Sequence, residues 1–244
     1  MIKAVLFDLG DTLVLNYATK DKINKSELTY KLFSKRGVNV LLTEFLNAEE
    51  YAKYVYDVEY DGKVERFEAG FFYEQIGKKL GLSHPRKFYA EIDDIIQTEL
   101  INNLQTPEKL HETLEELKKM DLKLAVISNG HRRTVLKKLE YCNLKKFFEL
   151  VFISYDLGED KSSLTAFKKI VEELKVFPNE CLMIGDRLDE DMYARKVGMW
   201  TALVKYVPAK KTFKEIVLPH AELYNFVEIP MIIKQINTGG IAYD

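Results

Sequence analysis

Two groups of acidic residues in this sequence directly follow short apolar runs. The first group is Asp8 with Asp11 close behind it, and the second opens at Asp186 and ends at Asp191. Carboxylates that crowd together repel one another unless a cation neutralises them, and hard oxygen ligands of this kind suit Mg²⁺. The spacing therefore predicts that Asp8, Asp186 and one later acid share a magnesium ion, on condition that the two runs are neighbouring strands.

Each acidic group also has an ordinary structural explanation. The first could form a simple turn, since Asp and Gly are common turn residues. Asp189 and Glu190 could belong to the first turn of a helix, where acids face the positive end of the helix dipole. The helix explanation accounts poorly for Asp186, which stands at the end of an apolar run.

Two further segments could bind phosphate. Ser128-Asn129-Gly130 ends another apolar run, and Lys161 lies in a loop before a helical pattern. A Ser hydroxyl and backbone N–H groups at a helix start can hold phosphate oxygens, and an ammonium group can neutralise both a phosphoryl oxygen and the acids. Taken singly, Ser128 could be a plain helix cap and Lys161 a solvated surface residue. Their order, with each at or after the end of a successive apolar run, favours a common site.

The elements that must position these residues are buried strands. Apolar runs occur at residues 2–7, 122–127, 150–153, 181–184 and 201–204. Helical patterns separate the later runs, including one that starts at Thr106, with Pro107 at its first position, and others at 164–174 and 189–197. This alternation predicts an α/β fold, a Rossmann-like three-layer core with a mostly parallel sheet. Ligands of such sheets bind at the carboxyl ends of the strands.

Residues 16–104 interrupt the alternation with helical patterns alone. We expect helices at residues 25–36, 43–57, 66–80 and 86–104. An insert of this length is too long for a simple crossover, so the sequence predicts a small all-helical domain at 16–104 and a core made of 1–15 and 105–244. Near the C-terminus we expect an edge strand at 221–227 and a closing helix at 229–236.

Composition excludes several classes of protein. The chain has 244 residues, 47% of them hydrophobic, and 36 basic side chains against 38 acidic ones. This balance argues against disorder and against a nucleic-acid partner. Cys142 and Cys181 are too few for a disulfide scaffold and are expected to be free buried thiols. With no membrane-length apolar run and no export signal, we expect a soluble cytoplasmic protein.

The set of motifs resembles the haloacid dehalogenase (HAD) superfamily of phosphohydrolases over about two thirds of the chain. FDLGDTLV (residues 7–14) is similar to its first motif, a strand that ends in a nucleophilic Asp. VISNG (126–130) resembles the second motif, Lys161 matches the basic residue of the third, and IGDRLDED (184–191) resembles the fourth. The helical insert lies where many members carry a helical cap domain.

The resemblance implies a role for each matching residue. Asp8 would attack phosphorus and form an aspartyl-phosphate. The implied Mg²⁺ ligands are Asp8, the backbone carbonyl of Gly10, Asp186 and Asp191. The phosphate-binding residues would be Ser128, Asn129 and Gly130, and Lys161 would balance the charge of the intermediate.

Gly10 departs from the family pattern. Phosphatases of this family usually carry a second Asp at that position, which protonates the leaving alcohol and later activates water. Gly10 can offer its carbonyl to a metal but has no acid. Asp11 or a residue of the helical insert could substitute, turnover could be slow, or the substrates could have good leaving groups. Gly10 also fits a true dehalogenase poorly, because that branch has a different residue there and no metal.

Three functions remain open. The leading hypothesis is a Mg²⁺-dependent phosphatase of a small phosphorylated metabolite, such as a sugar or triose phosphate. The second is a low-turnover phosphate-binding or regulatory protein on the same fold, favoured by Gly10. The third is transfer of the phosphoryl group from the aspartyl-phosphate to an acceptor other than water, as in a mutase.

Overall fold

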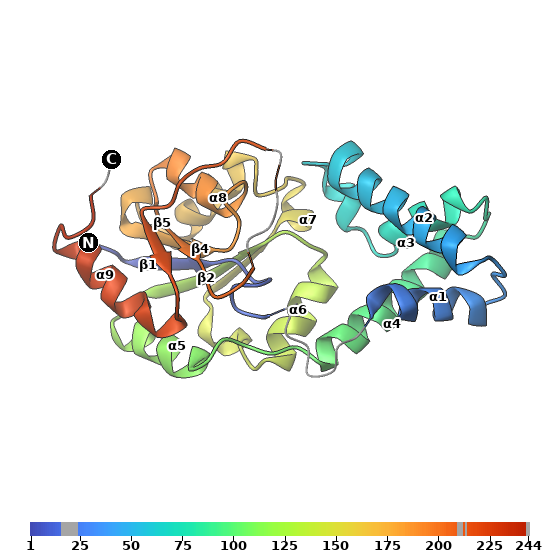
Figure 1. The fold of residues 1–244 in the computed structure, drawn as a ribbon. Helices are drawn as coiled ribbons and strands as arrows, with labels where there is room; N and C mark the ends of the chain where they lie inside the picture. The colour runs from blue at the N-terminus through green and yellow to red at the C-terminus, as the bar shows by residue number, and fades with distance from the viewer. Residues whose placement is uncertain (16–23, 209–211, 213, 243–244) are drawn as a thin grey trace. The chain divides into compact units, whose positions relative to one another are not determined.

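The chain divides into two compact units, each described here by itself. The computed structural model describes residues 1–15, 24–208, 212 and 214–242 (Figure 1). One unit comprises Met1–Ala18 and Leu104–Asp244, and the other comprises Thr19–Asn103. Residue 16, where the sequence predicts that the insert begins, lies outside the described residues.

The first unit is built on a parallel sheet with the order β3-β2-β1-β4-β5-β6. The strands are β1 (Ala4–Phe7), β2 (Lys123–Ser128), β3 (Leu150–Ile153), β4 (Cys181–Gly185), β5 (Trp200–Val204) and β6 (Ala221–Leu223). The N-terminal strand β1 is central, between β2 and β4. Every residue of β1 is buried, which explains its continuous apolar run. The expected edge strand is shorter than predicted, because a 3₁₀ turn follows at Phe226–Glu228.

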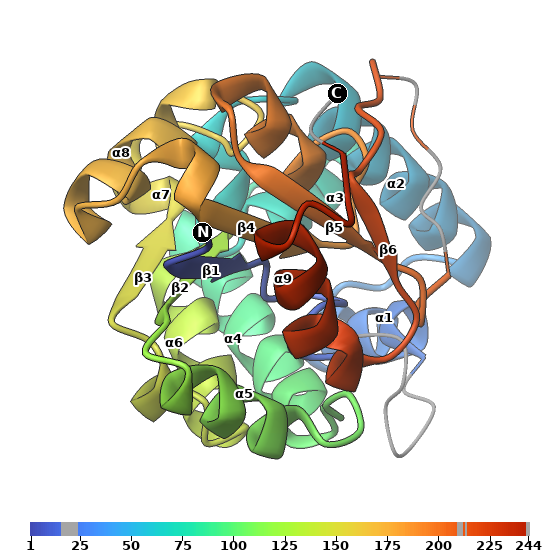
Figure 2. The ribbon, with the colours of Figure 1, turned by 90° about the vertical axis from the view of Figure 1, so that its left-hand side faces the viewer.

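Helices cover both faces of this sheet. They are α5 (Leu110–Lys119), α6 (Arg132–Tyr141), α7 (Ser154–Leu157), α8 (Leu164–Leu174) and α9 (Ile229–Asn237). In Figure 2, α7 and α8 lie on one side of the sheet and α5, α6 and α9 on the other. The backbone N–H of Ile2 donates to Asn237 Oδ1 (2.7 Å), which ties the first residues of the chain to the end of α9.

Two predicted helices are corrected by the structure. Thr106 does not begin a helix, since α5 starts at Leu110 after a turn in which Leu110 N–H donates to the Pro107 carbonyl (3.3 Å). The residue before α5, Lys109, has a left-handed backbone with φ of 56°. The helix expected at 189–197 is a 3₁₀ segment, Asp191–Val197, directly behind the acidic loop.

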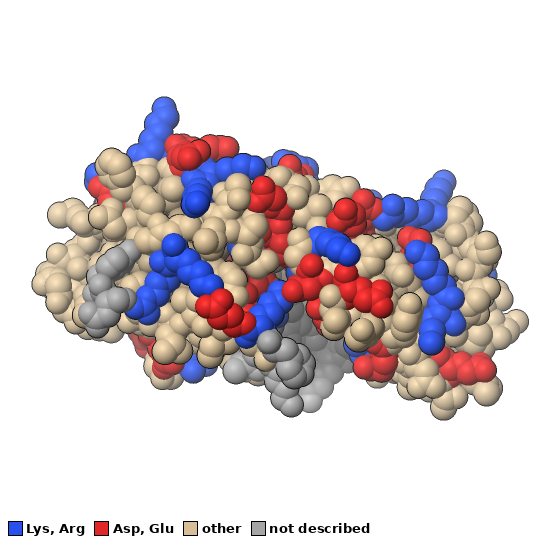
Figure 3. Space-filling model, turned by 90° about the horizontal axis from the view of Figure 1, so that it is seen from above, with Lys and Arg blue, Asp and Glu red and all other residues tan. Residues whose placement is uncertain are grey.

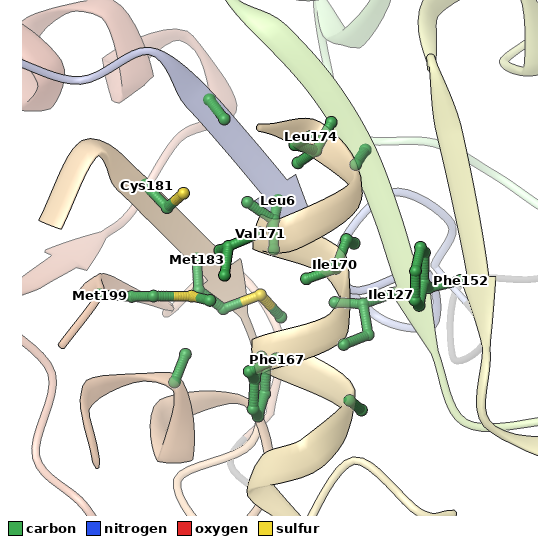
Figure 4. Close-up of a cluster of buried hydrophobic side chains, with 14 residues drawn as sticks. Leu6, Ile127, Phe152, Phe167, Ile170, Val171, Leu174, Cys181, Met183 and Met199 are labelled. Carbon is green, nitrogen blue, oxygen red and sulfur yellow. The ribbon is translucent and has the colours of Figure 1, made fainter. Parts of the chain in front are cut away.

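Alternate side chains of the strands pack against α8 (Figure 4). Leu6, Ile127 and Met183 come from three neighbouring strands and meet Phe167 and Ile170 of the helix. On the opposite face, Phe7 stacks on Phe226, with ring centroids 5.9 Å apart. Because β1 contributes to both clusters, the core fixes the strand that ends at Asp8.

The second unit is entirely helical over its described residues. Its helices are α1 (Lys25–Lys35), α2 (Leu42–Tyr54), α3 (Phe71–Lys79) and α4 (Arg86–Asn102), with a π-helical turn at Val55–Glu59 and a 3₁₀ turn at Val64–Phe67. The helix expected at 66–80 is therefore broken, at Gly70, whose φ is 81°. The unit has its own apolar core, which includes Phe33, Phe45 and Ile92.

The predicted fold class, a Rossmann-like three-layer core with a mostly parallel sheet and a small helical domain, is confirmed. Acidic and basic side chains are interspersed on the face that Figure 3 shows. Among the described residues, no helix is both long and apolar enough to cross a bilayer.

Candidate active site

The carboxyl ends of β1 and β4 bring the two acidic segments together. Phe7 pairs with Ile184 in the parallel register, and the backbone N–H of Asp8 donates to the Ile184 carbonyl (2.9 Å). Asp8 and Asp186 therefore leave adjacent strands at the same edge of the sheet. The condition set by the sequence, that the two apolar runs be neighbouring strands, is met.

Asp8, Asp186 and Asp191 form one buried cluster of carboxylates. One oxygen of each lies within 4.8 Å of the others. Asp191 reaches this position by lying against the backbone of Gly185, where a Cβ atom would be 2.2 Å from Asp191 Oδ2. The N–H of Arg187 donates to the same oxygen (3.0 Å). Only glycine at residue 185 leaves room for this carboxylate.

Lys161 is the cation of the cluster. Its Nζ lies 2.5 Å from Asp8 Oδ1 and 2.6 Å from Asp191 Oδ1, and its side chain is 2% exposed. Burial alone opposes its charge, but Asp191 and Asp8 outweigh that effect and raise the pKa of the ammonium above its ordinary value. Burial raises the pKa of Asp191, with Lys161 acting in the opposite direction. Lys161 is thus held as a buried ammonium against the Asp8 carboxylate.

The loop after β2 lies beside this cluster. Ser128 is buried, and the backbone N–H of Gly130 donates to Ser154 Oγ (3.2 Å). The Asn129 side chain accepts from the Lys161 N–H (3.0 Å) and donates to Asp160 (3.1 Å). The segment that the sequence predicts to bind phosphate therefore contacts the loop that carries Lys161.

A pocket of about 220 Å³ opens on these residues. Its wall includes the predicted site residues Asp8, Gly10, Ser128, Asn129, Gly130, Lys161 and Asp186. Asp11 is not part of this wall. It has a left-handed backbone, with φ of 61°, in a turn where its N–H donates to the Val14 carbonyl (2.6 Å). Asp191 lies behind the wall, against Lys161.

Four polar side chains of the wall were not singled out as site residues from the sequence. They are Thr134, Lys138, Arg187 and Glu190. Thr134 and Lys138 are four residues apart on α6, and this spacing could have placed both on one helix face. Arg187 pairs in a bidentate way with Asp189 (2.9 and 2.8 Å). No sequence signal marked Arg187 as a residue of the pocket, whereas Glu190 belongs to the acidic group that follows the fourth apolar run.

The donor set of the cluster fits a divalent cation. It consists of carboxylate oxygens, with the backbone of Gly10 in the same wall, and it contains no sulfur or imidazole. Lys161 contacts two of the three carboxylates, so the cluster keeps net negative charge. Hard oxygen ligands with excess negative charge suit Mg²⁺.

The fold is a Rossmann-like core, and its carboxylate cluster lies at the carboxyl ends of the central strands. The chain belongs to the haloacid dehalogenase-like hydrolases, since the model of that family matches residues 2–198. The predicted superfamily and the prediction that the protein is a hydrolytic enzyme are confirmed.

Two curated relatives are similar to nearly the whole chain. N-acylneuraminate-9-phosphatase of Homo sapiens is 24% identical, over 97% of this chain and 95% of its own. Glyceraldehyde 3-phosphate phosphatase of Pyrococcus furiosus is 27% identical, over 96% of this chain and 92% of its own.

Solved structures support the fold. A HAD phosphatase from Thermococcus onnurineus has a TM-score of 0.69 at 23% identity, covering 95% of this chain and 98% of its own. L-2-haloacid dehalogenase from Xanthobacter autotrophicus has a TM-score of 0.65 at 18% identity, covering 96% of this chain and 99% of its own. Because phosphatases and dehalogenases share this architecture, the choice between them depends on the site.

Proposed function

We propose that this protein is a Mg²⁺-dependent phosphatase that hydrolyses a small phosphorylated metabolite, a sugar or triose phosphate, through an aspartyl-phosphate. The observation that carries the proposal is the buried cluster of Asp8, Asp186 and Asp191 with Lys161. A metal-free dehalogenase has no need of two further carboxylates, such as Asp186 and Asp191, beside its nucleophile. Phosphoryl transfer does need such a group, because a divalent cation must bring an anionic nucleophile to an anionic phosphate.

In this proposal Asp8 is the nucleophile. One of its carboxylate oxygens attacks phosphorus as the bond from phosphorus to the leaving oxygen breaks. The leaving alkoxide takes a proton from solvent water and departs as the alcohol. Water then attacks phosphorus, releases inorganic phosphate and restores the Asp8 carboxylate. Lys161, 2.5 Å from Asp8, would stabilise the charge that develops on the transferred group.

The neighbouring residues would bind the phosphoryl oxygens and the metal. The Ser128 hydroxyl and the backbone around Gly130 border the pocket beside Asp8 and would donate to those oxygens. Asp8, the Gly10 carbonyl, Asp186 and Asp191 would hold Mg²⁺. When bound, Mg²⁺ supplies positive charge that orients the phosphate and offsets its repulsion from Asp8.

The substrate class rests on the pocket and on the relatives. A pocket of about 220 Å³ is smaller than the roughly 300–1,000 Å³ of typical ligand sites, so it suits a phosphoryl group with few further atoms. The curated relatives are named as phosphatases of an acylneuraminate 9-phosphate and of glyceraldehyde 3-phosphate. Both names describe small phosphorylated carbon compounds, the class proposed for this chain.

We also infer that residues 16–104 are a cap that selects the substrate, on a catalytic core of 1–15 and 105–244. The core segments on either side of the insert meet where Leu15 N–H donates to the Gln105 carbonyl (2.8 Å). Leu15 follows the turn that begins at Gly10, so the insert leaves the core close in sequence to the nucleophile. A closing cap would exclude water from the site.

A second function, phosphate binding with little turnover, is favoured by Gly10. The position has no side chain, and Asp11 lies in the Gly10–Val14 turn and is not part of the pocket wall. Loss of general acid–base help costs about 10² to 10⁴ in rate. Substrates with poor leaving groups would be affected most.

The deciding experiment is hydrolysis of an activated aryl phosphate and of a panel of phosphorylated metabolites, with Mg²⁺ and with chelator. We expect turnover with Mg²⁺ that Asp8→Asn abolishes. Equal rates for the wild type and Asp8→Asn would overturn the proposal that this site is a phosphatase. A single burst of product without further turnover would instead establish the low-turnover function.

A further inference from the structure

We propose that Asn129 is a positioning residue that holds Lys161 in place and does not contact the substrate. The proposal rests on the proposed function for its kinetic meaning, and it revises the role that the resemblance implies for this residue. Asn129 follows β2 directly, at the edge of the sheet where Asp8 and Asp186 leave their own strands.

The Asn129 side chain joins the loops that follow three different strands. Its Oδ1 accepts from the backbone N–H of Lys161 (3.0 Å), in the loop after β3. Its Nδ2 donates to Asp160 Oδ1 (3.1 Å) in that loop and to Glu190 Oε2 (3.0 Å) in the loop after β4. One amide thus spans sequence separations of 31, 32 and 61 residues.

These contacts use most of the hydrogen-bonding capacity of the amide. An Asn side chain has two N–H donors and one oxygen with two lone pairs. Both donors and one lone pair are engaged by the protein itself. A phosphoryl oxygen requires a donor, so direct binding would break a hydrogen bond to Asp160 or Glu190. Direct binding of a phosphoryl oxygen would thus take a hydrogen bond away from a carboxylate, and the carboxylate of Asp160 is buried, where such a loss costs most.

An amide suits this position better than other polar side chains. It must accept from a backbone N–H and donate to two carboxylates at once, which neither Asp nor Ser can do. Asp160 in turn accepts from the N–H of Ser162 (2.9 Å), so the backbone on both sides of Lys161 is fixed. The ammonium of Lys161 is then held 2.5 Å from Asp8 and 2.6 Å from Asp191.

The first test is the split between kcat and KM in Asn129→Ala, with Mg²⁺ and an aryl phosphate. Loss of a residue that orients a reacting group typically costs about 10- to 100-fold in rate. We expect kcat to fall by that factor, with KM and the inhibition constant of inorganic phosphate unchanged within about threefold. A rise in both constants with kcat retained would assign Asn129 to substrate binding and overturn the proposal, as would no change at all.

The second test is a double-mutant cycle with Lys161→Met. If Asn129 acts through Lys161, Asn129→Ala costs nothing further once the ammonium is gone. Rate losses that multiply in the double variant would overturn the proposal. Asn179→Ala is the control, because Asn179 lies in the turn before β4, at the amino ends of the strands. It should leave kcat and KM unchanged. If Asn129→Ala does not fold, Asn129→Ser replaces it with the same expectation.

The third test needs no turnover. The Lys161 amide N–H is bonded to the Asn129 side chain, so in Asn129→Ala it should exchange with deuterium faster than in the wild type. The Leu144 amide, which donates to the Leu139 carbonyl (2.8 Å) and has no contact with Asn129, serves as the internal reference. Unchanged exchange at Lys161 would overturn the proposal even in an active enzyme. A wild type without phosphatase activity would sink the proposed function, and this measurement would still decide whether Asn129 holds Lys161.

Discussion

At the scale of single residues, the buried ammonium of Lys161 joins two carboxylates of the cluster. Its side chain is 2% exposed and contacts the carboxylates of Asp8 and Asp191, which are also buried. A buried ion pair gives little net stability, but removal of one partner is costly because a buried charge is left uncompensated. Lys161 therefore matters for the structure around Asp8 and, in the proposed mechanism, for the chemistry as well.

We expect Lys161→Met to lower both activity and stability. Loss of one group that stabilises the transition state costs about 10² to 10³ in kcat, and loss of the buried cation costs about 3–5 kcal/mol of unfolding free energy. Steady-state kinetics and urea unfolding without Mg²⁺ measure the two effects. Lys145→Met, whose salt bridge is exposed, should change neither. A full kcat in Lys161→Met would remove this residue from the mechanism.

The two thiols give a prediction that depends on pH. Burial raises the pKa of Cys142 to about 11 and of Cys181 to about 12. Because the folded pKa lies above the ordinary value, the native protein keeps both thiols neutral at pH 8. As pH rises through 9 the unfolded chain ionises first, so this contribution to stability is lost towards pH 11–12.

We accordingly expect a disulfide reagent at pH 8 to react slowly with the native protein and to detect two thiols at once after unfolding. Cys142→Ala should reduce the final count to one and should remove the faster native reaction, since Cys142 is 9% exposed and Cys181 is fully buried. Rapid native labelling at Cys181 would contradict its burial.

At this scale the sequence predicted the acids and Lys161 from their types and order, but not the contacts of Asn129 or Glu190. Asp186 could be found because a charge at the end of an apolar run is unusual. Asn129 and Glu190 are 61 residues apart, and only the pairing of the strands brings them together.

At the scale of elements, the site depends on how closely Asp191 approaches the end of β4. A Cβ on Gly185 would lie 2.2–2.5 Å from three atoms of the Asp191 side chain. The 3₁₀ segment Asp191–Val197 starts with that residue, so the position of this segment and the geometry of the carboxylate cluster are coupled. The end of β4 and the 3₁₀ segment are therefore packed directly against each other.

We expect Gly185→Ala to push Asp191 out of the cluster. The Mg²⁺ concentration for half-maximal rate should rise at least tenfold, and the overpacking should cost about 1–3 kcal/mol of stability. A Mg²⁺ titration of the rate measures the first effect. Gly240→Ala is the control, because the nearest atom to its Cβ would be 3.5 Å away. An unchanged titration would mean that Asp191 takes no part in metal binding.

The elements themselves were largely predictable where burial is complete. The strands that the sequence predicts at 150–153 and 181–184 match β3 and β4 to within a residue, because buried parallel strands are continuously apolar. The start of α5 was not predictable, because Thr106 and Pro107 have the sequence pattern of a helix start but form a turn before the helix. Likewise Gly70, in its left-handed conformation, ends a helical pattern that side-chain periodicity alone would continue.

At the scale of the whole molecule, each unit has its own apolar core, and only the first contains the carboxylate cluster. A ligand that binds the native state alone stabilises it by mass action. Mg²⁺ should therefore act on stability through the core unit, whatever the substrate.

We expect saturating Mg²⁺ to raise the unfolding temperature of the wild type. At a concentration of about 100 times the dissociation constant the gain is about 2.7 kcal/mol. Asp186→Asn should abolish the shift. Phe45→Leu, in the core of the helical unit, should lower the unfolding temperature both with and without Mg²⁺ and should retain the Mg²⁺-induced shift. Thermal denaturation with and without Mg²⁺ measures this. A shift that survives Asp186→Asn would place the ion elsewhere.

The central place of β1 has a consequence for synthesis on the ribosome. Its two partners, β2 and β4, begin at Lys123 and Cys181, so the nascent strand emerges long before either neighbour has been translated. The helical segment Thr19–Asn103 is complete much earlier and carries its own apolar interior. The helical segment should therefore fold first during translation. The strand β1, which ends next to Asp8, should stay unpaired until β2 and β4 in the second half of the chain have been synthesised.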